Sequence, residues 1–321
     1  MSVRLDNVSV SFGDTRAVDS VDLAIDSGER FAVMGPSGSG KSTLLRAIAG
    51  LEESTGEIAI DGVSMAGVPT HRRPIGMMFQ DYALFPHMDV AGNVAFGLTV
   101  GGMDRSTAMD RARDLLDVVG LAGFGDRNVA TLSGGEQQRV ALARTLAPGP
   151  SVVMFDEPLG ATDQGLKDSL LAEMRHVIDD VGITSIYVTH DRHEAEAFAT
   201  RIGIMRAGEL IRTGTPSALW SDPGTPFVAR FVGHRNIVEA RPLGLGTAIV
   251  VVPARAITVA ENGRLPAIVT DCGFRDGEYD VTMTVAGQDL ATITDTPIAP
   301  GAEVGLEIDA SKVAELAVDE V

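Results

Sequence analysis

Hydrophobic and polar residues alternate in the first part of the chain and then give way to longer apolar runs. The alternation at 8–12 and again at 21–25 predicts two short strands, each with one face buried. A continuous apolar run at 30–34 predicts a buried strand that leads into a glycine-rich turn. Residues 43–49 have helical spacing that ends at Gly50, a favourable C-cap. Strand, glycine-rich loop and helix in this order form the setting that a phosphate-binding loop requires.

The middle of the chain changes from a helical pattern back to alternating units. Residues 81–132 are predicted to be mostly helical, with clear helical spacing at 106–119. The apolar run at 151–155 predicts a strand, 165–181 predicts a helix, and 184–188 predicts another buried strand. Buried strands that alternate with helices indicate an α/β fold with a largely parallel sheet.

The character of the sequence changes again near residue 235. Proline, glycine and valine become frequent, and 248–252, 267–270 and 279–285 have the pattern of short strands. The segment 235–321 holds six basic and fourteen acidic residues, a net charge of −8. We therefore expect a first domain at 1–234 and a small, barrel-like all-β domain at 235–321.

Composition narrows the class of protein. Hydrophobic residues make up 45% and charged residues 22% of the chain, a balance typical of folded proteins rather than disordered ones. No run approaches the roughly 20 apolar residues that span a bilayer, and the N-terminus lacks the pattern of a secretory signal. The single cysteine, Cys272, excludes an internal disulfide framework. A formal charge of −18 opposes sequence-independent binding to nucleic acid, so we expect no such partner.

One motif matches the phosphate-binding pattern G-x-x-x-x-G-K-[ST] in full. It consists of Gly35, Pro36, Ser37, Gly38, Ser39, Gly40, Lys41 and Ser42, with Thr43 directly after it. Glycines let successive backbone N–H groups converge on phosphate oxygens of ATP, and the following helix adds its positive N-terminal end. Lys41 is predicted to reach the β- and γ-phosphates, and the Ser42 hydroxyl to bind Mg²⁺. The alternative is an accidental glycine-rich turn, which the flanking strand and helix disfavour.

A second motif ends the apolar strand at 152–155 with two carboxylates, Asp156 and Glu157. Ligands of α/β sheets gather at the carboxyl ends of strands, so Asp156 is predicted to hold Mg²⁺ there. Glu157 is predicted to orient and deprotonate an attacking water. In isolation, two carboxylates after a strand would usually mark only the start of a solvent-exposed loop. Together with the loop at 35–42, it predicts a hydrolytic site.

A third motif, Leu-Ser-Gly-Gly-Glu-Gln-Gln-Arg at 132–139, lies ahead of this strand, with Gln80 before it and His190 after. Five elements in this order make residues 1 to about 234 resemble the nucleotide-binding subunit of an ABC transporter. The resemblance implies a P-loop ATPase domain with a helical subdomain at about 81–135, and it implies ATP hydrolysis.

The resemblance also implies roles for single residues. Phe12 corresponds to an aromatic ring that stacks on adenine, although a core position is the alternative. Gln80 corresponds to a glutamine that contacts Mg²⁺ and the water, and His190 to a histidine that contacts the γ-phosphate. In this family the serine-glycine-glycine motif faces the neighbouring subunit's nucleotide, and a nearby aspartate also belongs to the site. The residues in these last positions are Ser133, Gly134, Gly135 and Asp163.

Two positions depart from the family pattern. The serine-glycine-glycine motif commonly continues with glutamine, whereas this chain has Glu136. The loop after Glu157 usually reads leucine-serine-alanine-leucine-aspartate, whereas this chain has Leu-Gly-Ala-Thr-Asp at 159–163. The hydrolytic set is complete, and we expect the loop's dimer contacts to be weaker.

The segments 80–93, 214–216 and 227–233, with Asn236, resemble bacterial importer ATPases. That resemblance implies an OB-like (TOBE) domain at 235–321, a second copy of the chain, transmembrane permease subunits and, indirectly, an extracytoplasmic solute-binding protein. It places the chain on the cytoplasmic face of the membrane and favours ferric iron or thiamine over polyamine, sulfate or sugar. The alternatives are an exporter ATPase and a soluble ABC ATPase that acts on nucleic acid or ribosomes. The net charge of −8 in the C-terminal segment disfavours the latter.

Overall fold

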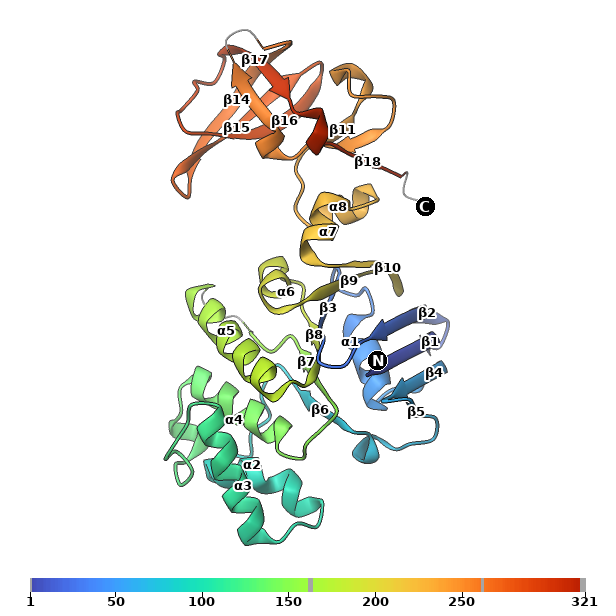
Figure 1. Cartoon of the computed structure of the whole chain (residues 1–321), viewed down its shortest axis with the longest axis vertical. Coiled ribbons are helices and arrows are strands. Elements are labelled where there is room, and N and C mark those ends of the chain that lie inside the picture. Colours follow the sequence, from blue (N-terminus) through green and yellow to red (C-terminus); the bar gives the residue numbers. More distant parts are fainter. Residues whose placement is uncertain (1, 161–163, 261–262, 318–321) are drawn as a thin grey trace. The chain divides into compact units, whose positions relative to one another are not determined.

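The computed structural model describes residues 2–160, 164–260 and 263–317, and these divide into two compact units (Figure 1). The units comprise Met1–Thr215 and Pro216–Val321. Residues 216–234 thus group with the C-terminal unit, whereas the sequence alone placed the boundary after residue 234. The physical reason is a small apolar cluster in which Ala229 packs with Val251 and Leu316.

The first unit alternates strands and helices. In chain order they are β1 (Val3–Phe12), β2 (Thr15–Ile25), β3 (Arg30–Met34), α1 (Lys41–Ala49), β4 (Thr55–Ile60), β5 (Val63–Ser64), β6 (Ile75–Met78), α2 (Val90–Val100), α3 (Arg105–Val118), α4 (Gly134–Leu146), β7 (Val152–Asp156), α5 (Gln164–Val181), β8 (Thr184–Val188), α6 (Arg192–Phe198), β9 (Arg201–Arg206) and β10 (Glu209–Gly214). None of the helices in the described ranges combines the length and apolar character needed to cross a membrane.

Two sheets form this unit. The larger has the order β10-β9-β3-β8-β7-β6 and is parallel except for β10, which confirms the predicted largely parallel sheet. The smaller is an antiparallel sheet of order β2-β1-β4-β5. The alternation at the N-terminus predicted short strands, but β1 and β2 are a 10- and 11-residue hairpin. Bulges near Val8 and Val10 shift the register, so the alternation is not continuous along either strand.

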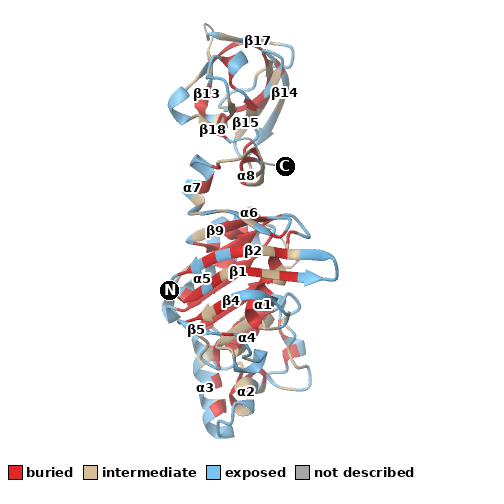
Figure 2. Ribbon diagram, turned by 90° about the vertical axis from the view of Figure 1, so that its right-hand side faces the viewer, coloured by how far each residue is buried: buried red, intermediate tan, exposed pale blue. Residues whose placement is uncertain are grey.

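Helix α1 lies between the two sheets and contacts strands of both. One apolar core joins α1 to the antiparallel sheet and to one face of β7 and β8. A second core covers the opposite face of β7 and β8 with α2, α4 and α5. Because both faces of β7 and β8 are covered, all five residues of each strand are buried. This explains why both strands read as unbroken apolar runs. Strands β1 and β2, in contrast, carry buried and exposed residues along their length (Figure 2).

The helical subdomain predicted at about 81–135 contains α2, α3 and the start of α4, but its first nine residues form a loop. Helix α2 begins only at Val90, where the Asp89 side chain caps it by accepting from Gly92 N. The preceding loop is held by Asn93, whose Oδ1 accepts from Phe85 N at 2.8 Å and whose Nδ2 donates to Phe85 O at 3.1 Å. Residues 81–89 therefore form a loop, which the Asn93 side chain ties to helix α2.

The second unit is mainly strands, which confirms the predicted all-β character. Its elements are α7 (Pro216–Ser221), α8 (Pro226–Phe231), β11 (Ile237–Glu239), β12 (Ile249–Val251), β13 (Ile257–Ala260), β14 (Leu265–Arg275), β15 (Glu278–Val285), β16 (Gln288–Thr294), β17 (Glu303–Ile308) and β18 (Ala314–Leu316). They form a three-stranded sheet, β11-β12-β18, and a five-stranded sheet, β13-β17-β14-β15-β16. Their inward side chains form one apolar core.

Shortened chains test where the first domain ends. In a chain that ends at Gly233, Ala229 loses its cover, and Trp220 O loses its contact with His234 Nε2, which lies 2.8 Å away. We expect limited proteolysis to trim this chain back to about Thr215 without loss of ATP binding, while the full chain is protected there. Protection of 216–233 in the chain that ends at Gly233 would contradict this and support a boundary after residue 234.

Candidate functional site

Four predicted motifs follow four strands that lie side by side. Strands β3, β8, β7 and β6 are parallel neighbours, so their carboxyl ends meet at one edge of the sheet. The glycine-rich loop follows β3, and His190 follows β8. Asp156 and Glu157 close β7, and Gln80 follows β6. This edge is where open α/β sheets bind their ligands.

The glycine-rich loop passes very close to neighbouring backbone. Gly40 has φ +98°, and a Cβ on it would lie 2.2 Å from Ala17 O. A Cβ on Gly35 would lie 2.4 Å from Met205 O. Larger residues are excluded at both positions, so these glycines fix the path that leads the loop into α1.

Lys41 lies inside the loop. Its Nζ donates to Gly35 O at 2.9 Å and to Pro36 O at 3.0 Å, and the residue is only 5% exposed. Burial lowers the pKa of Lys41 below its usual value, while the carboxylates of Glu157 and Asp156 act in the opposite direction. A partly desolvated ammonium group in a glycine-rich loop suits an anionic ligand.

Ser42 and Asp156 meet although they are 114 residues apart in sequence. Ser42 Oγ donates to Asp156 Oδ1 at 2.6 Å. A hydroxyl and a carboxylate are oxygen ligands that suit Mg²⁺, which takes few protein ligands and completes its shell with water and phosphate oxygens. No group of three or more His, Cys, Asp or Glu side chains that could hold a metal occurs in the described ranges.

Glu157 and His190 also come together. His190 Nδ1 lies 3.2 Å from Glu157 Oε2, and the histidine side chain is 65% exposed. Glu157 has a left-handed backbone with φ +48°, and its N–H donates to Val188 O at 3.0 Å. A non-glycine residue in that conformation is strained, and such strain is found most often at functional sites. The geometry presents a carboxylate beside an accessible imidazole.

Gln80 is exposed and lies near the loop that follows Glu157. Its Nε2 would lie 3.8 Å from a Cβ placed on Gly160. The segment after Gln80 is held to α4 by Arg144, whose guanidinium donates to Tyr82 O at 2.5 Å and to Ala83 O at 2.7 Å. Gln80 thus stands between the sheet edge and the helical region.

Phe12 ends β1, and its side chain is half exposed, at 50%. The structure therefore excludes the alternative of a core position. Phe12 pairs with Thr15 in the hairpin whose Ala17 carbonyl abuts Gly40. The Phe12 ring therefore lies on the same hairpin as Ala17, whose carbonyl contacts the phosphate-binding motif.

Ser133, Gly134 and Gly135 lie at the start of α4. Ser133 is the N-cap, and its hydroxyl accepts from Glu136 N at 3.3 Å. Glu136 Oε2 in turn accepts from Ser133 N at 2.7 Å, which completes a capping box. Glu136 thus caps the helix from the position where the family commonly has glutamine. Asp163 lies outside the described residues.

Known proteins share these motifs. The profile of the ABC transporter family matches residues 18–160. The Fe(3+) ions import ATP-binding protein FbpC of Streptomyces avermitilis is 51% identical over 76% of this chain and 71% of its own length. Its namesake from Streptomyces coelicolor is 43% identical over 97% of this chain and 96% of its own length. The chain belongs to the ABC transporter family.

A solved structure supports the same assignment. The ATP-binding cassette MJ0796, a dimer in a post-hydrolysis state bound to ADP and Pi, has a TM-score of 0.57 and 33% identity. It covers 66% of this chain and 98% of its own length. This chain is accordingly an ABC ATPase, an enzyme that hydrolyses ATP.

The sequence did not point to a buried network behind His190 in this ABC ATPase. Glu194 Oε2 accepts from Thr189 Oγ1 at 2.8 Å and from Tyr187 Oη at 3.0 Å, and Glu194 Oε1 accepts from Lys167 Nζ at 3.0 Å. Burial, followed by the charge of Glu194, raises the pKa of Tyr187 well above its usual value. A glutamate on a short helix gives no periodic signal, so only the fold reveals its burial.

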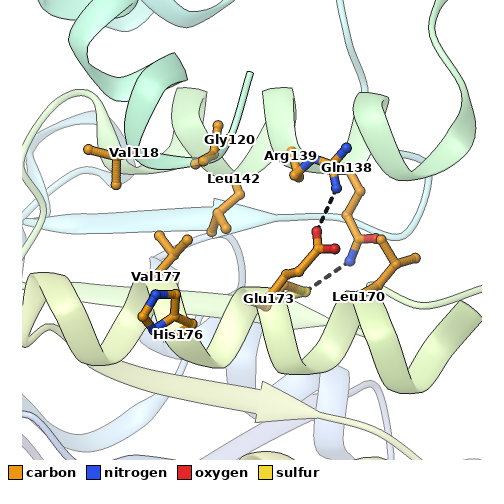
Figure 3. Close-up of a pocket in the computed structure, with 11 residues that line it drawn as sticks. Val118, Gly120, Gln138, Arg139, Leu142, Leu170, Glu173, His176 and Val177 are labelled. Atoms are coloured by element: carbon orange, nitrogen blue, oxygen red, sulfur yellow. Dashed lines mark hydrogen bonds and ion pairs between the residues drawn. The ribbon is translucent and has the colours of Figure 1, made fainter. Parts of the chain in front are cut away.

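A cavity of about 340 Å³ lies between α4 and α5 of the ABC ATPase, near the end of α3 (Figure 3). Apolar residues such as Leu142 and Val177 line much of it, and Arg139 pairs with Glu173 at 2.5 Å beside it. None of the predicted nucleotide-binding residues lines it. It is therefore distinct from the site of ATP hydrolysis.

The capping box gives a pH-dependent prediction. Hydrogen bonds from Ser133 lower the pKa of Glu136, so its stabilising effect is present above the ordinary glutamate pKa and is lost as pH falls through the lowered value. Glu136→Ala should lower the thermal unfolding midpoint at neutral pH, and this difference should shrink in acid. Glu136→Gln should be milder at neutral pH, because its amide oxygen still accepts from Ser133 N. An equal loss for Ala and Gln at neutral pH would contradict the capping role.

Proposed function

We propose that this ABC ATPase hydrolyses ATP at the β3-β8-β7-β6 edge and energises the import of ferric iron. The observation that carries the proposal is the convergence at that edge. There the buried Lys41 ammonium, the Ser42 and Asp156 pair at 2.6 Å, and the Glu157 and His190 pair at 3.2 Å meet, although they come from distant parts of the sequence.

In this proposal the loop at 35–43 binds the phosphates of ATP. Its backbone N–H groups and the first turn of α1 face the phosphate oxygens, and Lys41 leaves its contacts with Gly35 O and Pro36 O to neutralise their charge. The half-exposed ring of Phe12 supplies a face on which adenine stacks.

Ser42, Asp156 and Gln80 would hold Mg²⁺. The support is the oxygen pair of Ser42 and Asp156, with the Gln80 amide close to the loop that follows Glu157. When bound, the ion neutralises charge that develops on the transferring phosphoryl group.

Glu157 acts as the general base. It accepts a proton from water as the water oxygen bonds to the γ-phosphorus and the bond from that phosphorus to the bridging oxygen breaks, which releases ADP and phosphate. His190, beside Glu157 and exposed to solvent, is placed to contact the γ-phosphate and to hold the carboxylate in position.

A second copy of the chain completes each site. Ser133, Gly134 and Gly135 lie at the N-terminus of α4, whose first N–H groups suit an anion. We assign them, with Asp163, to the nucleotide held by the partner subunit. The dimeric state of the similar ATP-binding cassette supports this arrangement.

The dimer is proposed to act on transmembrane permease subunits from the cytoplasmic face of the membrane, with an extracytoplasmic binding protein that delivers the solute. Opening and closing of the dimer would transmit the energy of hydrolysis. The names of the two Streptomyces relatives support Fe³⁺ as the solute.

Uptake by cells that lack the gene tests the solute. We expect uptake of radiolabelled Fe³⁺ to fall to background and to return with the wild-type gene but not with Glu157→Gln. Uptake of thiamine, spermidine and sulfate should be unchanged. Normal Fe³⁺ uptake together with loss of another solute would reassign the transporter, and normal uptake of all would remove the import role.

A further inference from the structure

Glu194 is a buried carboxylate that the hydrolysis mechanism does not use. It lies on α6 and is 4% exposed. A buried charge is tolerated only when it is paired and hydrogen-bonded, and Glu194 has three donors, from Thr189, Tyr187 and Lys167. The surroundings therefore hold this carboxylate in one place.

One of these contacts, from Thr189, leads to the backbone of His190. Thr189 precedes the histidine, is 1% exposed, and donates to Glu194 through its hydroxyl. The same hydroxyl accepts from Asp191 N at 2.9 Å, on the other side of His190. The Asp191 side chain then caps α6 by accepting from His193 N at 2.8 Å. The backbone on both sides of His190 is thus fastened to one buried hydroxyl.

The third contact comes from another element. Lys167 lies in the first turn of α5, and its Nζ is 3.0 Å from Glu194 Oε1. Its side chain is 17% exposed, so the pair is well shielded from solvent. The carboxylate therefore ties the start of α5 to the backbone around His190 through a charge-assisted bond.

We propose that Glu194 is a positioning residue for ATP hydrolysis. Through the Thr189 hydroxyl it fixes the backbone of His190 so that the imidazole stays beside Glu157, and through Lys167 it makes that position depend on α5. This inference rests on the proposed roles of His190 and Glu157.

Two substitutions test the Lys167–Glu194 ion pair and the Thr189–Glu194 hydrogen bond separately. Glu194→Gln places an amide NH₂ or a neutral oxygen opposite the Lys167 ammonium, and Thr189→Val removes the hydroxyl with little change of shape. Each should lower kcat by about tenfold to a hundredfold, the range expected from misplacement of a reacting group, while ATP affinity stays within about twofold. Thr189→Ser keeps the hydroxyl and should retain kcat within about twofold of wild type.

A double-mutant cycle with His190→Ala distinguishes positioning from general damage. If Glu194 acts through His190, Glu194→Gln and Thr189→Val should cause no further loss of single-turnover rate in the His190→Ala background. Glu29→Gln, which alters an ion pair with Arg201 at the opposite end of the sheet, is the matched control and should leave kcat unchanged. All variants are measured as the full chain, with folding checked by circular dichroism.

The outcomes separate the inference from the proposed function. A wild-type chain without ATPase activity, or a fully active His190→Ala variant, would remove the proposed function. If those two behave as expected, undiminished kcat in both Glu194→Gln and Thr189→Val would overturn the inference alone. The inference alone would also be overturned if Glu194→Gln and Thr189→Val lowered the single-turnover rate as much in the His190→Ala background as in the wild type. Should Glu194→Gln fail to fold, the Thr189→Ser and Thr189→Val pair decides.

Discussion

Replacing Glu157 by glutamine is expected to leave ATP bound and to slow phosphate release by about 10²–10⁴-fold, the usual cost of losing a general base. Glutamine preserves the size of the side chain and its ability to accept from His190, but it cannot take a proton from water. The strained backbone of Glu157, with φ +48°, shows that the fold holds this carboxylate in a costly position beside Asp156.

The substitution has a second expected consequence. If ATP holds the two subunits together until it is hydrolysed, Glu157→Gln should accumulate as a dimer in ATP, measured by size-exclusion chromatography. Glu29→Gln makes the same chemical change in an ion pair away from the sheet edge and should remain fully active. Near-normal phosphate release by Glu157→Gln would remove Glu157 from the role of base.

Mixing two inactive variants is expected to restore hydrolysis. Lys41→Ala removes the only ammonium inside the described phosphate-binding loop, and Ser133→Arg blocks the N-terminus of α4. Each should be inactive alone. If Ser133 serves the partner's nucleotide, a mixed dimer has one site with both residues intact and one site with both changed.

The control for this experiment places both substitutions in one chain. When that chain is mixed with Lys41→Ala, no dimer contains an intact site, so no activity should appear. Subunit exchange is followed with fluorescent labels in both mixtures. Complete exchange of Lys41→Ala with Ser133→Arg without recovery of phosphate release would contradict a site shared between subunits.

Much of the fold could be predicted because its central strands have local signals. β7 and β8 are covered on both faces, so they appear as unbroken apolar runs, and α1 ends at Gly50 in a left-handed C-cap. The N-terminal hairpin was harder, because bulges near Val8 and Val10 interrupt the alternation. The segment 81–89 was wrongly predicted as helical, because the side chain of Asn93, which fastens it as a loop, acts across several residues.

The residues of the candidate site that lie in short sequence motifs could be predicted. Ser42 and Asp156 were each predicted from a motif to bind Mg²⁺, and the structure places Ser42 Oγ 2.6 Å from Asp156 Oδ1. Glu194 could not be found in this way, because its donors come from β8, from the loop after it and from α5, and no spacing in the sequence relates them. The sequence identified the groups that react, whereas the contacts that position them required the fold.

Vesicles that contain the permease subunits test ATP-driven import most directly. This chain and ATP are enclosed, the Fe³⁺-loaded binding protein is added outside, and Fe³⁺ accumulation and phosphate release are measured together. We predict that Fe³⁺ accumulates inside in step with phosphate release, and that both cease when Glu157→Gln replaces the wild-type chain. Outward movement of solute, or accumulation that continues with Glu157→Gln, would contradict ATP-driven import by this chain.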